Sequence, residues 1–185
     1  TYTAVDNSTI KDEIAKGNIY LCTTLVTDMS GNSVSNTFQN FFNNISFNSN
    51  ISFWDVSNVI NMDGMFFNAD LFNQDISSWD TSKVENMGSL FKNASSFNQS
   101  ISGWNTSKVT KMLDLFRGAR TFNQDISSWD TVNVNSMSNM FNGATSFNQD
   151  ISSWCVSNFS FEPDNFSTNS PLIDSYKPIW GNCPE

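Results

Sequence analysis

The sequence contains no histidine, and this absence removes the side chain that most often serves as a general base or a zinc ligand. Basic residues are also scarce, with 9 lysines and arginines against 18 acids and a formal net charge of -9. Such a chain repels phosphate backbones and anionic lipid surfaces, so we expect it to bind neither nucleic acid nor a membrane surface. No run of about 18 apolar residues occurs, and we therefore expect no direct insertion into a membrane.

Cysteine is rare, with three residues at Cys22, Cys155 and Cys183, so at least one is unpaired or bonded to another chain. Phenylalanine, in contrast, is abundant at 17 residues, while leucine is used sparsely. The 185 residues are enough for one domain with a sizeable core. We expect that core to be aromatic.

The chain is dominated by a unit of 25 residues that recurs from about Ile51 to Val156. Two aromatic positions keep this spacing, at Trp54, Trp79, Trp104, Trp129 and Trp154, and at Phe66, Phe91, Phe116 and Phe141. A fixed period of this size is typical of stacked repeats, in which each unit buries its apolar side chains against its neighbours. The sequence therefore predicts that these rings form a continuous core, and that Trp104 and Phe116 touch their equivalents in both adjacent repeats.

The repeat divides the single domain into three parts. Residues 1–28 form an N-terminal cap, with a short helix over Ser8–Gly17 and a strand candidate over Ile19–Val26. Residues 29–158 form the repeat solenoid, whose degraded first repeat carries an insertion at 31–39. Residues 159–185 form a C-terminal cap, because prolines prevent another regular coil there.

Each regular repeat has two physical halves. Val84–Ala94 has apolar residues every three or four positions, which predicts a short helix or helical turn facing the core. Phe97–Trp104 is extended in character and predicts one short strand per repeat, paired in parallel with its neighbours. We therefore expect an α/β solenoid. In-register stacking turns each repeat position into a column, and the column Asn73, Asn98, Asn123 and Asn148 is expected to bond free backbone groups at a turn.

Two further polar columns have competing interpretations. Asp75, Asp125 and Asp150 could share Ca²⁺ between neighbouring carboxylates, but a solvated rim is favoured because only Asp125 and Asp150 are adjacent. The second column contains Thr81, Thr106 and Thr131, with serines at Ser57, Ser82 and Ser107. A regular array of hydroxyls suits an ice-binding face, although turn residues that bond their own backbone are the favoured interpretation.

The segment Trp54–Ser77, with the sequence WDVSNVINMDGMFFNADLFNQDIS, resembles the repeat unit of the BspA-like leucine-rich-repeat surface proteins. The Trp-Asp-x-Ser-x-Val, Met-x-x-Met/Leu-Phe and Phe-Asn-Gln-Asp-Ile-Ser blocks occur together over about Ile51–Val156. The resemblance implies a right-handed, leucine-rich-repeat-like solenoid that is secreted or attached to a cell surface and used for adhesion or partner binding. It brings no catalytic motif and no cofactor.

The C-terminal cysteines are expected to pair with each other. Cys155 replaces the polar residue that follows Trp in the other repeats, and Cys183 lies three residues after Trp180. A Cys155–Cys183 disulfide would fix the tail over the last coil, whereas the alternative is two reduced, buried thiols.

Three functions follow from these features. The leading hypothesis is an extracellular or cell-surface binding module that presents its repeat surface to a protein or glycan on another cell or in the matrix. An ice-binding protein with a Thr/Ser/Asn face is the alternative from another class. A carbohydrate-active hydrolase that uses paired carboxylates is the third, and we expect no enzyme because no recessed acid pair is evident. The sequence leaves the oligomeric state open.

Overall fold

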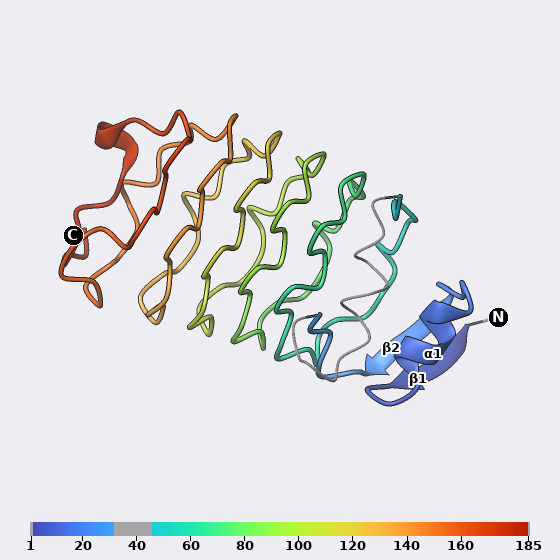
Figure 1. The fold of residues 1–185 in the computed structure, drawn as a ribbon. Helices are drawn as coiled ribbons and strands as arrows, with labels where there is room; N and C mark the ends of the chain where they lie inside the picture. The colour runs from blue at the N-terminus through green and yellow to red at the C-terminus, as the bar shows by residue number, and fades with distance from the viewer. Residues whose placement is uncertain (1, 32–45, 185) are drawn as a thin grey trace.

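The computed structural model describes residues 2–31 and 46–184. The chain begins with a small βαβ unit and continues as a row of stacked coils that ends at the C-terminal cap (Figure 1). The predicted insertion at 31–39 lies outside the described residues except for Gly31. No helix in the described part of the chain is long and apolar enough to cross a membrane.

The N-terminal cap consists of strand β1 (Thr3–Asp6), helix α1 (Ile10–Ala15) and strand β2 (Leu21–Leu25). The two strands pair in parallel with Thr3 opposite Leu21, and α1 makes the crossover. Val5, Ile10, Ile14 and Leu21 are buried, so the unit has an apolar interior of its own. The helix and β2 lie where the sequence predicted them. Strand β1 was missed because its segment carries a single large apolar side chain, Val5, and shows no alternating pattern.

Asp6 closes the turn before α1. Its carboxylate accepts hydrogen bonds from the backbone N–H and hydroxyl groups of Ser8 and Thr9. These bonds favour the charged form and lower the pKa of Asp6 to about 2, with the Ser8 hydroxyl as the largest contributor.

Successive coils share one parallel β-bridge per coil, among several backbone hydrogen bonds between them. The paired residues are Asp28 with Asn61, Asn61 with Asn86, Asn86 with Lys111 and Lys111 with Ser136. The prediction of a strand over Phe97–Trp104 is therefore wrong. In that segment the N–H of Asn98 bonds a side chain, Asn73 Oδ1 at 2.9 Å, and a turn links Ile101 to Trp104.

The predicted helical half of the repeat is a chain of tight turns. The N–H groups of Met87, Ser89, Phe91 and Asn93 donate to carbonyl groups of the next coil instead of to their own segment, with N···O distances of 3.0, 2.8, 3.0 and 2.7 Å. An α-helix would use those N–H groups internally, and so no helix forms there. Two residues in each coil have positive φ, as at Ser89 (51°) and Asn93 (60°). The matching positions in other coils hold Gly, Asn or Asp, which tolerate this conformation.

The core is a set of stacked aromatic columns. Phe116 is fully buried and lies 5.7 Å from both Phe91 and Phe141, measured between ring centroids. Trp104 is 4% exposed and stacks on Trp79 at 6.4 Å. From Trp79 to Trp154, each buried indole N–H in the column is also satisfied by a carbonyl group of the preceding coil, as from Trp129 Nε1 to Ile101 at 3.1 Å. Packing and hydrogen bonding therefore connect the same pairs of coils.

A second ladder of side chains runs beside the aromatic core. The Oδ1 atom of Asn98 accepts from the backbone N–H of Asn123 and from Gln124 Nε2, both at 2.9 Å. Asn73, Asn123 and Asn148 make equivalent bonds to the backbone one coil later. Each asparagine Oδ1 thus accepts a backbone N–H of the next coil that would otherwise need a backbone carbonyl as its acceptor.

The C-terminal cap is fixed by a disulfide between Cys155 and Cys183, as the sequence predicted. The 3-10 helix η1 (Asp174–Tyr176) follows the last coil, and the N–H of Ile151 donates to the Tyr176 carbonyl at 2.9 Å. Trp180 packs edge-on against Phe166 with a centroid distance of 5.0 Å. The tail therefore covers the aromatic column at the end of the stack.

Candidate functional site

The segments that carry the coil-to-coil backbone bonds form one side of the stack, and we call it the ladder face. It comprises residues 59–68, 84–93, 109–118 and 134–143. Its inward positions hardly change from coil to coil. Valine, methionine and phenylalanine recur at three of them, and all twelve side chains are fully buried: Val59, Val84, Val109 and Val134; Met62, Met87, Met112 and Met137; Phe66, Phe91, Phe116 and Phe141.

The outward positions of the ladder face differ from one coil to the next. Four columns show this: Ile60, Glu85, Thr110 and Asn135; Asn61, Asn86, Lys111 and Ser136; Asp63, Gly88, Leu113 and Ser138; Phe67, Lys92, Arg117 and Asn142. All of these residues except Gly88 are exposed or partly exposed. The ladder face is therefore a constant scaffold that carries a varied surface.

The edge opposite this variation is uniform even where it is exposed. Gln74, Gln99, Gln124 and Gln149 repeat without change, as do Ser77, Ser102, Ser127 and Ser152. The serines take part in turns, for example through the bond from Ser127 N to Asp125 Oδ1 at 2.9 Å. Their uniformity has a structural cause.

The carboxylates of the Asp75, Asp125 and Asp150 column each accept a hydrogen bond from the serine two residues later. Bonds from Ser77 and Ser152 lower the pKa of Asp75 and Asp150, and the backbone and hydroxyl of Ser127 do the same for Asp125. Within residues 2–31 and 46–184, no three acidic, cysteine or histidine residues cluster in a way that could hold a metal ion. The carboxylates serve the turns.

The threonine column lies inside the stack. Thr81, Thr106 and Thr131 are 1–2% exposed, and their hydroxyl groups donate to backbone carbonyls of the next coil at 2.7–3.0 Å. These hydroxyls therefore offer no surface to ice. The favoured interpretation, that these residues bond their own backbone, is therefore wrong for the threonines, which bond carbonyls of the neighbouring coil.

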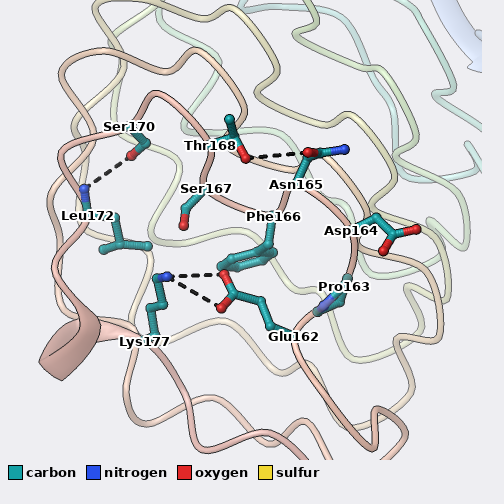
Figure 2. A pocket seen from close by; sticks show the side chains of 10 residues that line it. All are labelled: Glu162, Pro163, Asp164, Asn165, Phe166, Ser167, Thr168, Ser170, Leu172 and Lys177. Carbon is teal, nitrogen blue, oxygen red and sulfur yellow. Dashed lines mark hydrogen bonds and ion pairs between the residues drawn. The ribbon is translucent and has the colours of Figure 1, made fainter.

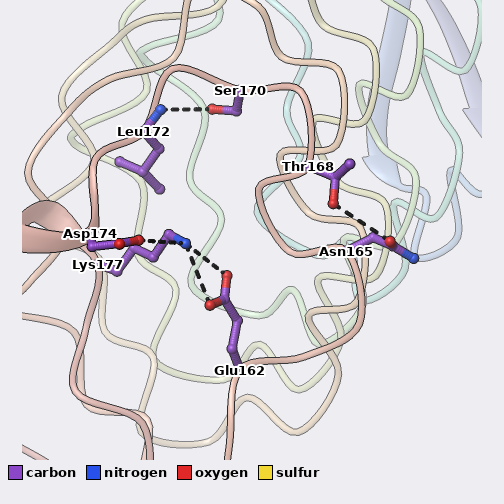
Figure 3. A network of polar contacts seen from close by, with 7 residues as sticks. All are labelled: Glu162, Asn165, Thr168, Ser170, Leu172, Asp174 and Lys177. Carbon is purple, nitrogen blue, oxygen red and sulfur yellow. Dashed lines mark hydrogen bonds and ion pairs between the residues drawn. The ribbon is translucent and has the colours of Figure 1, made fainter.

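A polar hollow of about 580 Å³ opens at the C-terminal cap, between the last coil and the returning tail (Figure 2). The one basic side chain that lines it is Lys177, which bonds Glu162 at 3.1 Å and Asp174 at 3.1 Å (Figure 3). Burial alone would lower the pKa of the Lys177 ammonium, but the hydrogen bonds with Glu162 and Asp174 outweigh it, and the pKa is raised. Lys177 thus connects the last coil to the tail, and its charge is neutralised within the cap.

The N-terminal end carries a small aromatic patch. Tyr2 and Tyr20, each 60% exposed, lie 5.5 and 6.0 Å from the ring centre of Phe53. The residues equivalent to Phe53 in later coils are Ser78, Gly103, Ser128 and Ser153. Phe53 therefore joins the cap to the first complete coil, a contact that later coils do not need.

The ladder face was not singled out by the sequence reasoning, which concentrated on the columns that repeat. The signal was nevertheless present. When the repeats are aligned at their tryptophans, the outward positions from the residue after Val84 to Lys92 all differ between coils, and some positions on either side, such as those of Lys83 and Ser95, differ as well.

Comparison with known proteins places the chain in a family. The family described as Mycoplasma protein of unknown function, DUF285, matches residues 17–112 and 101–172. The chain therefore belongs to this family. No curated protein and no solved structure matches it.

Proposed function

We propose that this member of the DUF285 family is a binding module that recognises a protein or glycan partner through the ladder face, without catalysis. The observation that carries the proposal is the separation of constant and varied positions. The buried Val, Met, Phe and Trp columns and the Gln and Ser columns repeat unchanged, whereas four outward columns of one face change from coil to coil. A scaffold that holds different side chains at regular spacing suits recognition of an extended partner.

The fold supports this function because it leaves few groups unsatisfied. Backbone bonds, indole N–H groups and asparagine amides all run from coil to coil. Outward side chains on the ladder face can therefore be exchanged without loss of the stack. We further propose that the unit is of the BspA-like, leucine-rich-repeat-like kind and that the coils form a right-handed solenoid, in which turns replace the helix and a single parallel bridge per coil replaces the strand.

We also propose an extracellular or cell-surface location. The Cys155–Cys183 disulfide supports it, because such bonds form and persist mainly in oxidising environments. A partner on another cell or in the matrix would then meet the ladder face directly.

The test compares two variants of the whole chain in capture experiments on glycan and matrix-protein arrays. The first changes the ladder face at Thr110→Glu and Leu113→Glu. The second adds the same charge on the uniform edge, at Ser77→Glu and Ser102→Glu. Partner capture that is lost in the first variant and kept in the second supports the ladder face. Equal capture by both variants contradicts it, and no capture by the unchanged chain at micromolar concentration counts against a binding module altogether.

A further inference from the structure

One coil of this acidic protein is basic. Residues 101–125 carry Lys108, Lys111, Arg117 and Arg120 against two acids, Asp114 and Asp125. The coil at 51–75 has four acids and no base, and the coil at 126–150 has two acids and no base: Asp55, Asp63, Asp70 and Asp75; Asp130 and Asp150. Positive charge is therefore confined to the middle of the stack, within a chain of net charge -9.

Most of this charge is exposed and has no acidic partner. We call Lys92, Lys108, Lys111, Arg117 and Arg120 the basic band. All except Lys92 are exposed, and Lys92 is partly exposed. Among residues 2–31 and 46–184, no ion pair involves Lys108, Lys111 or Arg120.

Asp114 brings the other two cations together. Lys92 and Arg117 occupy the same position in adjacent coils, so their charges repel each other. The Asp114 carboxylate contacts both side chains, with Oδ2 at 2.8 Å from Lys92 Nζ and Oδ1 at 3.6 Å from Arg117 Nη1. It is only 8% exposed, so it cannot move out to water. One buried carboxylate offsets two cations only in part, and the excess charge faces solvent.

Acids are also missing at two positions near the basic band. The residue after Trp is Asp55, Asp80 and Asp130 in three coils, but it is Asn105 in the basic coil. The column of Asp75, Asp125 and Asp150 is interrupted by Ser100 immediately before that coil. Both replacements keep a turn-forming side chain or hydroxyl and remove a negative charge. Gain of bases and loss of acids therefore coincide at one place.

We propose that the basic band binds an anionic oligosaccharide, through the carboxylate or sulfate groups of its sugars. This inference rests on the proposed binding function and names the chemical class of its ligand. Thr110, Asn86 and Ser136 lie on the same part of the ladder face and supply neutral groups for sugar hydroxyls. A nucleic acid duplex fits less well, because its dense charge would extend beyond the basic coil toward the acidic coils at 51–75 and 126–150.

The test measures binding of a sulfated heparin oligosaccharide and a polygalacturonate fragment to the whole chain by titration calorimetry. Lys111→Gln with Arg120→Gln removes two cations from the basic band. Lys11→Gln with Lys16→Gln removes two cations from the N-terminal cap and gives the same net charge. Lys92 and Arg117 are kept because they offset buried Asp114. We expect the first variant to bind about tenfold more weakly or worse, and the control to stay within about threefold.

Each outcome decides the inference. Equal weakening in both variants would show attraction to net charge alone and overturn the site. Tighter binding of polyglutamate or duplex DNA than of either glycan would overturn the ligand class. Capture of a neutral glycan or a protein through the ladder face, with no binding of the anionic probes, would overturn this inference and leave the proposed function intact. Variants must match the unchanged chain in thermal unfolding, and binding that falls only in the band variant supports the proposal.

Discussion

The indole Nε1 of Trp104 donates a hydrogen bond to the carbonyl oxygen of Ile76 at 3.1 Å. This bond joins one coil to the preceding coil at the same place where the Trp104 ring stacks on Trp79. Trp54 makes the corresponding bond to Ile19 of the N-terminal cap at 2.9 Å. The tryptophan column therefore ties the cap and the coils into one stack.

Trp104→Ala is expected to lower the free energy of unfolding by about 3–5 kcal/mol, through lost burial and the cavity left behind. Trp104→Phe keeps a ring and loses the bond to Ile76, so it should cost about 1–3 kcal/mol. Denaturant unfolding measures both values. Hydrogen exchange should show the loss spreading to adjacent coils, because each interface supports the next. A Trp104→Ala effect no larger than that of exposed Ser102→Ala would contradict the core role.

Asn98→Leu is expected to destabilise the protein by about 1–3 kcal/mol, because the N–H of Asn123 then loses its acceptor. Asn98→Asp is the matched control, since it keeps an oxygen at the same place. Thermal unfolding of both variants near neutral pH tests the ladder. If the two variants unfolded at the same temperature, the oxygen acceptor would not be what the position requires.

Removal of the disulfide by Cys183→Ser is expected to cost about 3 kcal/mol in the chain-entropy model. The loss should be concentrated in the C-terminal cap, where Trp180 covers Phe166. Cys22→Ser is the control, because Cys22 is a free, exposed thiol. Reductant should lower the unfolding temperature of the unmodified chain and of Cys22→Ser. It should leave the unfolding temperature of Cys183→Ser unchanged.

Acid is expected to weaken the turns that contain Asp75, Asp125 and Asp150. The pKa of each carboxyl is lowered below its ordinary value of 3.8 by hydrogen bonds from the following serine. A lowered folded-state pKa gives stability that is present above the unfolded value and is lost as the pH falls through the folded value. Unfolding temperature should therefore fall as the pH drops below about 4.

The triple variant Asp75→Asn, Asp125→Asn, Asp150→Asn tests the source of this pH dependence. The chain already uses asparagine in the same turn, where Asn50 Oδ1 accepts from Ser52 N at 2.9 Å. The variant should keep its unfolding temperature near pH 7 and lose less of it in acid. An unchanged acid response would assign the effect to other carboxyls, such as Asp6.

The sequence alone determined the period, the core and the caps of this protein. Trp104 and Phe116 could be placed inside because they recur at a strict 25-residue step. Large rings at such a step are buried by stacking on the equivalent rings of the neighbouring coils. Cys155 and Cys183 could be paired because both lie at the C-terminal end of the repeats, where Cys155 replaces the polar residue that follows Trp in the other copies.

Only the tertiary structure decided how the coils are joined. Apolar spacing over Val84–Ala94 is the same for a helix and for a chain of turns that face a core. The choice depends on whether the N–H of Ser89 bonds its own segment or the Leu113 carbonyl, and that acceptor lies in another coil. The ladder face, and with it the candidate site, follows from that choice, because a long-range backbone bond leaves no local mark in the sequence.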